Sequence, residues 1–555
     1  MPTFAAIDLG SNSCRLKIAK VVAHRLKTIH EDREVTRLGA SVFESGLVSP
    51  EAMAATLRIL KRFQRAVQAH GVDQLRAVAT AALRDARNAQ AFVAWVKAET
   101  GWTLEIISGL EEGRLIHRGI MNTEPGTAGR VVLVDVGGGS CEITLSEHKR
   151  LKETVSLPLG AVRLTEEFLS SDPPQETDLI RLRRFIGREL RRAHRRIQPG
   201  EVSLVIATSG TAAALCEAEL ALRKTQSKSG AKVGSKIATK ANAKAGIKAK
   251  AGTKAKAGAR SGAKSLRANV ADSLASASLT PARAVRKLAN RLSRMTLPER
   301  EALPGVGLRR AEIITAGAEV YAALLENMDL PGFRYSSLGL RDGILAQMLA
   351  EQDARATAHH EFEQERWESV LTTARRYGVD PRQAEPVKNH ALQLFRDLRA
   401  LHQLPDEYGK WLAAAAVLKD IGKFVNHQGH HRHTQYLISS SEIYGYTLLQ
   451  RTLVSAIARY LGKTRPQAND RAMRNLPPQE HVNIHRAVVL LRLALALNQD
   501  RASDVLKVTA KVYPKRVYLE IAQGRTGAEL ELWSLRKEAP YFRDVFGREL
   551  FAALK

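Results

Sequence analysis

The N-terminal part of the chain alternates between helix-like and strand-like hydrophobic patterns. Apolar residues at helical spacing fill residues 49–71, between a Ser-Pro start signal and a glycine stop, and predict a helix. Short aliphatic runs at 75–80 and 104–108 predict strands, and each precedes a predicted helix, at 81–101 and 110–122. This alternation is typical of an α/β domain.

The rest of the chain changes its pattern twice. Residues 203–220 predict a strand, a glycine turn and a helix, and residues 281–350 predict helices with one strand at 333–340. The pattern then becomes one of long helices rich in His, Leu and Ala. Near the C-terminus the period shortens to two, so that residues 506–523 and 528–535 predict strands of a small closing module.

One pattern occurs twice. Residues 4–22 and 131–147 each predict a strand–turn–strand hairpin with Gly and Ser at its tip. Such a tip presents backbone N–H groups to an anion, and an Asp at the end of the first strand can hold Mg²⁺. Two of these loops on duplicated domains would clamp one phosphate group from both sides. The alternative, two ordinary tight hairpins, is disfavoured by the four matches at an offset of 127: Asp8 with Asp135, Gly10 with Gly137, Ser13 with Ser140, and Cys14 with Cys141.

Composition narrows the class of protein. The chain has 555 residues, of which 44% are hydrophobic, so we expect about three or four folded domains. Its formal net charge of +28 favours polyanionic partners. Much of that charge lies at 224–267, where 11 Lys and 2 Arg occur without any acid. The surrounding Lys/Ala/Gly segment, about 222–270, cannot bury a core, and we predict a disordered insertion that either tethers polyanions or is a neutral expansion.

The cysteines and the absence of long apolar runs indicate a cytoplasmic protein. Three cysteines argue against a disulfide framework and suit a reducing compartment. The N-terminus lacks the pattern of a signal peptide, and the apolar runs are too short or too interrupted to span a bilayer. We expect Cys14 and Cys141 to be small buried hydrophobes rather than nucleophiles.

Over residues 1–350 the chain resembles the exopolyphosphatase / guanosine pentaphosphate phosphohydrolase (Ppx/GppA) family. The resemblance implies an α/β fold with two actin-like (ribonuclease H-like) domains, 1–125 and 126–350. A helical, degenerate His-Asp (HD) type domain at 351–504 and a small C-terminal α+β module at 505–555 would follow. The matching stretches, in order, are "AAIDLGSNSCRLKIA", "AVATAALRDARN", "IISGLEEGRLIHRGI", "LVDVGGGSCEITL", "SLPLGAVRLTEEF", "ATSGTAAAL", "RRAEIITAGAEV" and "SSLGLRDGIL".

The resemblance also implies a reaction, the Mg²⁺-dependent hydrolysis of a terminal phosphoanhydride with release of orthophosphate. The catalytic base of the family maps onto Glu112, since water is a poor nucleophile until a base takes its proton. Glu111 is the neighbouring alternative, and only one of the two can face a cleft. Without the resemblance, a solvated Glu-Glu pair at a helix start would be preferred.

The family's binding residues map onto both hairpins and three later motifs. Asp8 and Asp135 are the expected Mg²⁺ ligands. Glu142 is either a further metal or water contact or an outward strand residue. Arg309 could replace Arg310. The expected phosphate-binding residues are Gly10, Ser11, Asn12, Ser13, Arg84, Gly137, Gly138, Gly139, Ser140, Ser209, Gly210, Thr211 and Arg310.

Residues 413–438 resemble an HD-type phosphohydrolase that has lost its metal ligands. The His-Asp pair reads Lys419-Asp420, the first His falls near Gln383, and the late Asp falls near Asn498; His390 is out of register. We therefore predict no catalytic metal there. The remaining cluster of His430, His431 and His433 with Arg432 is expected on a loop, where it packs or meets anions, and Lys419 and Lys423 would line a path for a polyanion.

The predicted helix at 179–197 carries eight arginines. They form either a solvated basic face or a binding surface for polyphosphate or nucleic acid, and the solvated face is favoured.

Taken together, the sequence predicts an exopolyphosphatase. Guanosine pentaphosphate 5′-phosphohydrolase is the close alternative, and a non-catalytic polyphosphate or alarmone sensor and a kinase of the same superfold are rivals. A homodimer is expected from the resemblance alone.

Overall fold

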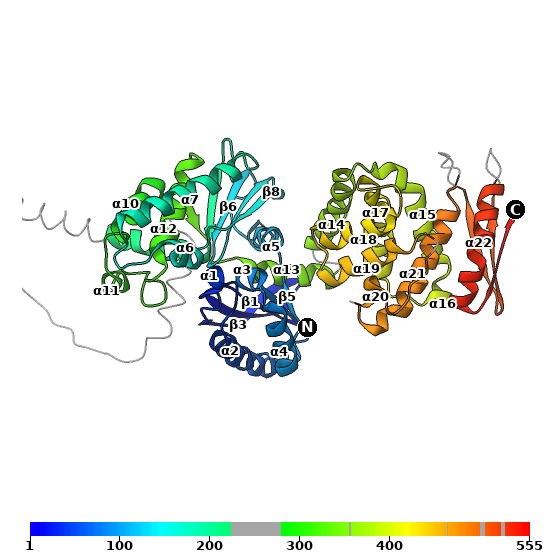
Figure 1. Cartoon of the computed structure of the whole chain (residues 1–555), viewed down its shortest axis with the longest axis horizontal. Coiled ribbons are helices and arrows are strands. Elements are labelled where there is room, and N and C mark those ends of the chain that lie inside the picture. The colour runs from blue at the N-terminus through cyan, green and yellow to red at the C-terminus, as the bar shows by residue number, and fades with distance from the viewer. Residues whose placement is uncertain are drawn as a thin grey trace, which may run out of the picture. The chain divides into compact units, whose positions relative to one another are not determined.

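The computed structural model describes residues 1–121, 123–223, 279–353, 357–462, 464–474, 476–499, 506–522 and 528–555. They form two compact units, Met1–His359 and His360–Lys555 (Figure 1). The Lys-rich insertion predicted at 222–270 lies outside the described residues from position 224 onward.

The first unit contains two mixed sheets. The first has the strand order β3-β2-β1-β4-β5 and the second the order β10-β11-β9-β6-β7-β8. The strands predicted at 75–80 and 104–108 are confirmed as β4 and β5. The strands are β1 (Thr3–Leu9), β2 (Ser13–Val22), β3 (Arg25–Val35), β4 (Gln74–Ala79), β5 (Leu104–Ile106), β6 (Arg130–Val136), β7 (Cys141–Glu147), β8 (Arg150–Leu157), β9 (Leu204–Thr208), β10 (Thr280–Pro281) and β11 (Gly332–Tyr335).

The predicted repeat is confirmed in both position and register. The β1–β2 and β6–β7 hairpins are both antiparallel, and at their ends Asp8 pairs with Arg15 and Asp135 pairs with Glu142. Each first strand also pairs in parallel with the strand that follows the intervening helices, β1 with β4 and β6 with β9. Cys14 and Cys141 are buried, as predicted, because both lie on strand faces directed into a core.

Helices cover both faces of each sheet. The helices α2 (Pro50–Ala69) and α4 (Ala89–Thr100) pack on the outer face of the first sheet, and α7 (Glu176–His194), α10 (Ala282–Leu292) and α12 (Ile314–Asn327) pack on the outer face of the second. Figure 1 shows these helices outside the two sheets. This arrangement fits the predicted actin-like pair of domains. The remaining short helices are α1 (Val42–Ser45), α3 (Ala81–Asp85), α6 (Ala161–Phe168) and α11 (Leu297–Glu301).

Two crossing helices separate the sheets. The inner faces of both sheets pack on α5 (Gly109–Met121) and α13 (Leu340–Gln352) in one shared core. The helices touch backbone to backbone, because a Cβ at Gly343 would lie 1.8 Å from the carbonyl oxygen of Leu115. Glycine therefore permits this crossing, which places the start of α5 beside the hairpin tips.

Two sequence expectations in this unit are wrong in detail. The single helix predicted at 81–101 is two helices, α3 and α4, because Ala86 adopts an extended conformation after the first of them. The glycine turn predicted after β9 is absent: helix begins directly at Ser209, which takes a positive φ of 74°.

The second unit is mainly helical around a core of its own. Its small sheet has the order β12-β13-β14 and is covered by α22. The strand predicted at 528–535 is wrong, since these residues open α22 and bury Leu535 at helical spacing. The elements are α14 (Thr357–Arg376), α15 (Pro381–Asp397), α16 (Arg399–His402), α17 (Glu407–Leu418), a 3-10 turn (Ile421–Phe424), α18 (His430–Ser440), α19 (Leu448–Arg459), α20 (Arg471–Arg474), α21 (Pro478–Ala496), β12 (Val508–Val512), β13 (Arg516–Ile521), α22 (Glu529–Phe546) and β14 (Glu549–Leu554). No helix among the described residues combines the length and apolarity needed to cross a lipid bilayer.

Candidate active site

A cavity of about 580 Å³ opens between the two sheets of the first unit. Both hairpin tips, the start of α5 and the start of α13 line it. Nearly all residues predicted for the site meet here, and of these only Arg84 and Glu142 do not line the cavity. The predicted residues that line the cavity are Asp8, Gly10, Ser11, Asn12, Ser13, Glu112, Asp135, Gly137, Gly138, Gly139, Ser140, Ser209, Gly210, Thr211 and Arg310.

The two tips are closed by the same backbone turn. The N–H of Gly10 donates to the carbonyl oxygen of Ser13 at 3.1 Å, and the N–H of Gly137 donates to that of Ser140 at 2.9 Å. A Cβ at Gly139 would lie 2.5 Å from the Cβ of Ala81, so only glycine lets the second tip approach the first sheet this closely. The duplicated tips can therefore face one small anion from two sides.

Helix α6 supports the second tip from behind. The N–H of Ala161 donates to the carbonyl oxygen of Gly137 at 2.9 Å, and that of Val162 donates to the carbonyl oxygen of Gly138 at 2.8 Å. Arg163 adds a side-chain bond, with its Nε–H donating to the carbonyl oxygen of Gly139 at 2.8 Å. With three consecutive carbonyl oxygens held by α6, the orientation of this loop is fixed.

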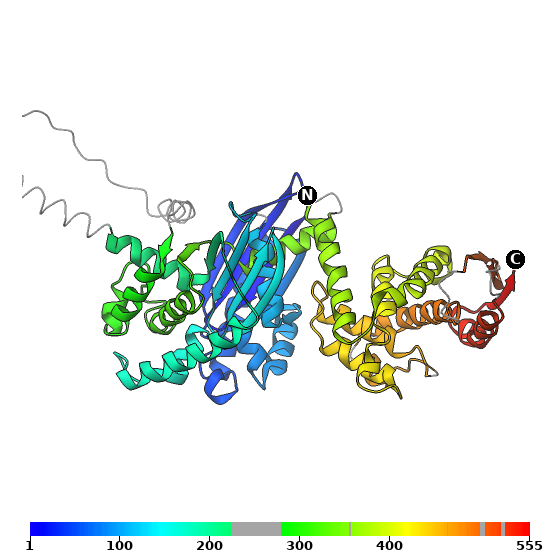
Figure 2. The same cartoon turned by 90° about the horizontal axis from the view of Figure 1, so that it is seen from above.

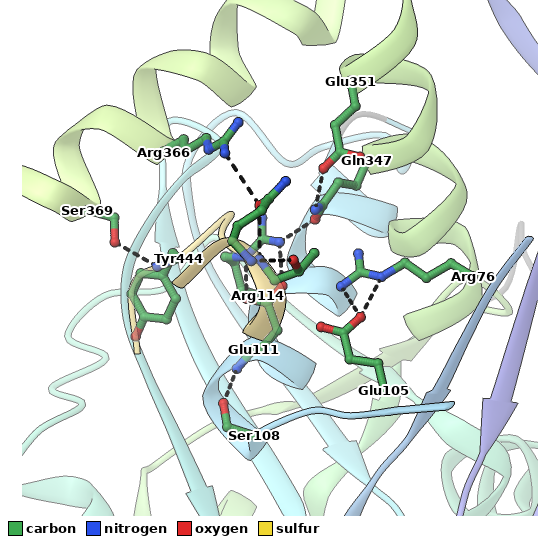
Figure 3. Close-up of polar contacts among 12 residues, drawn as sticks. Arg76, Glu105, Ser108, Glu111, Arg114, Gln347, Glu351, Arg366, Ser369 and Tyr444 are labelled. Atoms are coloured by element: carbon green, nitrogen blue, oxygen red, sulfur yellow. Dashed lines mark hydrogen bonds and ion pairs between the residues drawn. The ribbon is translucent and has the colours of Figure 1, made fainter. Parts of the chain in front are cut away.

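The adjacent glutamates of α5 point to different partners. Glu112 lines the cavity, and Glu111 does not. Glu111 accepts two hydrogen bonds from Arg114, at 2.7 and 2.8 Å, and Arg114 also donates to Gln347 of α13 (Figure 3). Glu111 thus belongs to the packing between α5 and α13, and Glu112 is the carboxylate available to a bound ligand.

Glu112 and Glu142 form a buried acidic pair beneath the tips. Ser156 donates to Oε1 of Glu142 at 2.7 Å, and the Oε2 atoms of both glutamates are buried without a hydrogen-bond partner. Burial and then the charge of Asp135 raise the pKa of Glu142 to about 7. Burial and then the charge of Glu142 hold the pKa of Glu112 well above its ordinary value.

Arg84 faces this acidic pair rather than the open cavity. Its Nη1 lies 3.6 Å from Oε2 of Glu112 and donates to the carbonyl oxygen of Ile107 at 3.0 Å. Its charge opposes the burial that raises the pKa of Glu112. Arg84 therefore tunes the carboxylate of Glu112 in this structure.

The acidic residues fit a divalent cation. Burial raises the pKa of both Asp8 and Asp135, although the charge of Arg15 opposes this shift at each residue. Among the described residues, no three His, Cys, Asp or Glu side chains are grouped closely enough to hold a metal by themselves. Mg²⁺ typically uses one or two carboxylates and takes its other ligands from water and substrate phosphates. Asp8 and Asp135 line the cavity and supply two such carboxylates, and Oε2 of the neighbouring Glu142 has no hydrogen-bond partner.

Four arginines form a basic part of the cavity wall, and three of them were not predicted. Arg15, Arg33 and Arg341 line it with Arg310. Burial, followed by repulsion from Arg15, lowers the pKa of Arg33 to about 9 and that of Arg310 to about 10. The sequence repeat could have identified one of them. At the offset of 127, Arg15 corresponds to Glu142, which was already a candidate site residue. Guanidinium groups that repel one another in this way provide a site for several phosphate charges.

The segment after β9 joins this wall to the second tip. Ser209 Oγ donates to the carbonyl oxygen of Val136 at 2.9 Å. A Cβ at Gly210 would overlap the guanidinium of Arg310, since it would lie 1.3 Å from Nη2. A side chain at this position would displace the guanidinium of Arg310 from its place in the cavity.

The predicted ligand positions of the second unit hold no metal-type cluster among the described residues. Asp420 is bound by Lys419 and by Lys423, whose Nζ lies 2.9 Å from Oδ1. His390 is buried and its Nε2 lies 2.9 Å from the carbonyl oxygen of Leu506. The histidine cluster was expected on a loop, and this expectation is wrong. His430, His431 and His433 lie in the first turns of α18.

The chain matches known proteins over both units. The model of the Ppx/GppA phosphatase family matches residues 17–245 and 232–352, and that of Ppx/GppA phosphatase domain III matches residues 365–539. A solved Ppx/GppA family member from Aquifex aeolicus is 26% identical, with 63% of this chain and 99% of that chain covered and a TM-score of 0.47. An exopolyphosphatase from Cytophaga hutchinsonii is 23% identical, with 63% and 98% covered and a TM-score of 0.51, and this likeness shows the fold.

Proposed function

The chain belongs to the Ppx/GppA phosphatase family and is a phosphoanhydride hydrolase, and from this premise we propose that it is an exopolyphosphatase. Its substrate would be inorganic polyphosphate, from which it releases orthophosphate one terminal unit at a time. The meeting of four arginines with Asp8, Asp135 and Glu112 in one cavity carries this proposal. The arginines suit a chain of phosphates, and Glu112 suits the attack of water on one end of it.

The residues of the first unit would divide the work as follows. The N–H groups of the two hairpin tips bind the terminal phosphoryl group, and the arginines of the wall bind the phosphates behind it. Glu112 takes a proton from water as the water oxygen attacks the terminal phosphorus. The P–O bond to the next phosphate breaks, and the shortened chain leaves with the bridging oxygen.

Mg²⁺ is the proposed cofactor, held by Asp8, Asp135 and Glu142. When bound, it would neutralise charge on the phosphate oxygens. Its positive charge would also favour the ionised form of Glu112, whose pKa is raised in the protein alone.

One observation favours guanosine pentaphosphate as a second substrate. Tyr335 lines the cavity on the side of Arg310 and Arg15. An aromatic ring beside guanidinium groups can accept a nucleobase as well as phosphates.

We also propose that the second unit is a degenerate HD-type domain, in which the ammonium groups of Lys419 and Lys423 neutralise Asp420.

The deciding experiment measures phosphate release from long-chain polyphosphate and from guanosine pentaphosphate, with wild type, Glu112→Gln and Glu111→Gln. Loss of the base should lower kcat by about 10² to 10⁴-fold. Glu111→Gln should keep most of the activity, because Glu111 contacts Arg114 outside the cavity. Activity on neither substrate in the wild type, with tight binding of either, would instead identify a sensor. Equal activity of Glu112→Gln and wild type would reject Glu112 as the base.

A further inference from the structure

Helix α7 carries more positive charge than its acidic neighbours neutralise. Helix α7 and the two residues after it carry eight arginines, and four of them have partners on other turns or elements: Arg181 with Asp178, Arg183 with Glu319, Arg192 with Glu189, and Arg196 with Glu153. Arg188 shares Glu189 with Arg192. Among the described residues, Arg184, Arg191 and Arg195 have no acidic partner, and all three are exposed.

The under-neutralised arginines lie on one face of the helix. Arg184, Arg188, Arg191 and Arg195 follow one another at intervals of four, three and four residues, which is the spacing of a single helical face. With a rise of 1.5 Å per residue, this arginine stripe extends over roughly 16 Å. Favourable interaction with the helix dipole explains basic residues in the last turn, but not those farther back.

A second basic helix, α10, packs on α12, as α7 does. Glu319 of α12 is fully buried and binds Arg183 of α7 at 2.7 Å and Arg286 of α10 at 2.8 Å. The two helices are thereby tied to one carboxylate. Helix α10 and the residues just after it carry four more exposed cations that lack an acidic partner among the described residues: Arg283, Lys287, Arg291 and Arg294.

The arginine stripe ends in a hollow of its own. A groove of about 560 Å³ is lined by Arg188, Arg191, Arg192, His194 and Arg195, with Asn327 from the end of α12. Figure 2 shows α7 along the outer edge of the first unit. None of these residues lines the cavity between the sheets.

We propose that the arginine stripe of α7 is a second binding site for long-chain polyphosphate, separate from the catalytic cavity. This choice of ligand rests on the proposed function. A single-stranded nucleic acid would use exposed aromatic side chains on which its bases stack. Among the described residues of α7 and α10, the one exposed large apolar side chain is Ile180, and Phe185 lies partly buried with the guanidinium of Arg188 4.9 Å from its ring centroid. The surface thus recognises charge without bases.

A second binding site of this kind would promote the hydrolysis of long chains only. A chain held on α7 stays near the enzyme between rounds of cleavage, which raises the effective concentration of its free end at the cavity. Tripolyphosphate is too short to gain from this second contact. Chain-length preference should therefore depend on α7.

The test compares two variants with the same change in charge. Arg184→Glu/Arg191→Glu/Arg195→Glu removes the arginine stripe. Arg25→Glu/Arg58→Glu/Arg65→Glu is the matched control, because these arginines are exposed and lack an acidic partner among the described residues. Binding of long-chain polyphosphate is measured in EDTA over a range of salt concentrations, and phosphate release is measured with Mg²⁺ from long chains and from tripolyphosphate.

We expect the α7 variant to raise the Kd for long chains at least about tenfold over the control. With three phosphate contacts removed, the slope of log Kd against log salt should fall by about 2. Its kcat/KM for tripolyphosphate should equal that of the control, which also shows that the fold is intact. Equal Kd and equal slope in the two variants would overturn the inference, as would loss of RNA binding with unchanged polyphosphate binding. If the wild type hydrolyses neither substrate, the proposed function fails, and the binding comparison still decides whether α7 binds the chain.

Discussion

The guanidinium of Arg163 holds the carbonyl oxygen of Gly139, at 2.8 Å, while the same group pairs with Asp85. Gly139 belongs to the second hairpin tip, and Asp85 follows Arg84 on α3. Phe43 lies beneath the guanidinium, 4.0 Å from its carbon to the ring centroid. One side chain thus joins the hairpin tip of the second sheet to the helices α1 and α3 that accompany the first.

Arg163→Lys should therefore lower kcat while leaving the fold intact. A lysine keeps the charge but cannot bond Gly139 and Asp85 with separate nitrogens of one planar group. We expect a fall in kcat of about tenfold or more, because misplacement of a binding loop weakens contacts made in the transition state. Steady-state kinetics of Arg163→Lys, Asp85→Asn and the double variant check this. Strictly additive effects in the double variant would show that the two residues act independently.

The pH dependence of kcat/KM should respond to the neighbours of Glu112 with opposite signs. A base must be ionised, so activity rises as pH passes the pKa of Glu112. Arg84 lowers that pKa, so Arg84→Gln should move the rising limb to higher pH. The charge of Glu142 raises the pKa of Glu112. The residual activity of Glu142→Gln should therefore rise at a lower pH than the activity of the wild type. Shifts of both variants in the same direction would contradict the assignment of the limb to Glu112.

Glu166→Gln should stabilise the protein at high pH only. Burial raises the pKa of Glu166 to about 7, although its Oε1 accepts the N–H of Ser41 at 3.2 Å. Because the folded state keeps this proton longer than the unfolded state, stability falls as pH rises from about 4.5 to about 7. Glutamine keeps an acceptor for Ser41 and cannot ionise. Thermal melting should give equal Tm values at pH 4 and a higher Tm for the variant at pH 8, whereas the exposed control Glu51→Gln should show no such divergence.

Gly343→Ala should destabilise the first unit by about 2 to 3 kcal/mol. The new Cβ would lie 1.8 Å from the carbonyl oxygen of Leu115, and backbone cannot move aside as a side chain can. Gly187→Ala in α7 is the matched control, since its nearest neighbour would be Nη1 of Arg191 at 3.4 Å. The control should gain up to about 1 kcal/mol from helix propensity. Urea unfolding of the two variants measures both effects, and equal unfolding curves would exclude close contact between α5 and α13.

The sequence predicted the parts of the fold that depend on local pattern. The two hairpins were found because their spacing repeats, and they carry most of the candidate site. The segment 528–535 failed because its alternation of Glu and Leu fits a strand as well as the buried stripe of α22. The basic wall was missed for a different reason: Arg15 and Arg33 meet through the register of the β2–β3 pair, and Arg341 joins them only through the docking of α13.

Arg15 and Glu142 occupy equivalent places in the two hairpins, and their charges are opposite. Two identical hairpins, related by a rotation, would present the same charges to both sides of a ligand. The replacement of one charge by the other makes the hairpins electrostatically different, because Arg15 lines the cavity and Glu142 is buried beside Asp135. If the chain is the exopolyphosphatase proposed above, this asymmetry would give a bound phosphate chain a preferred direction and would favour its shortening from one end.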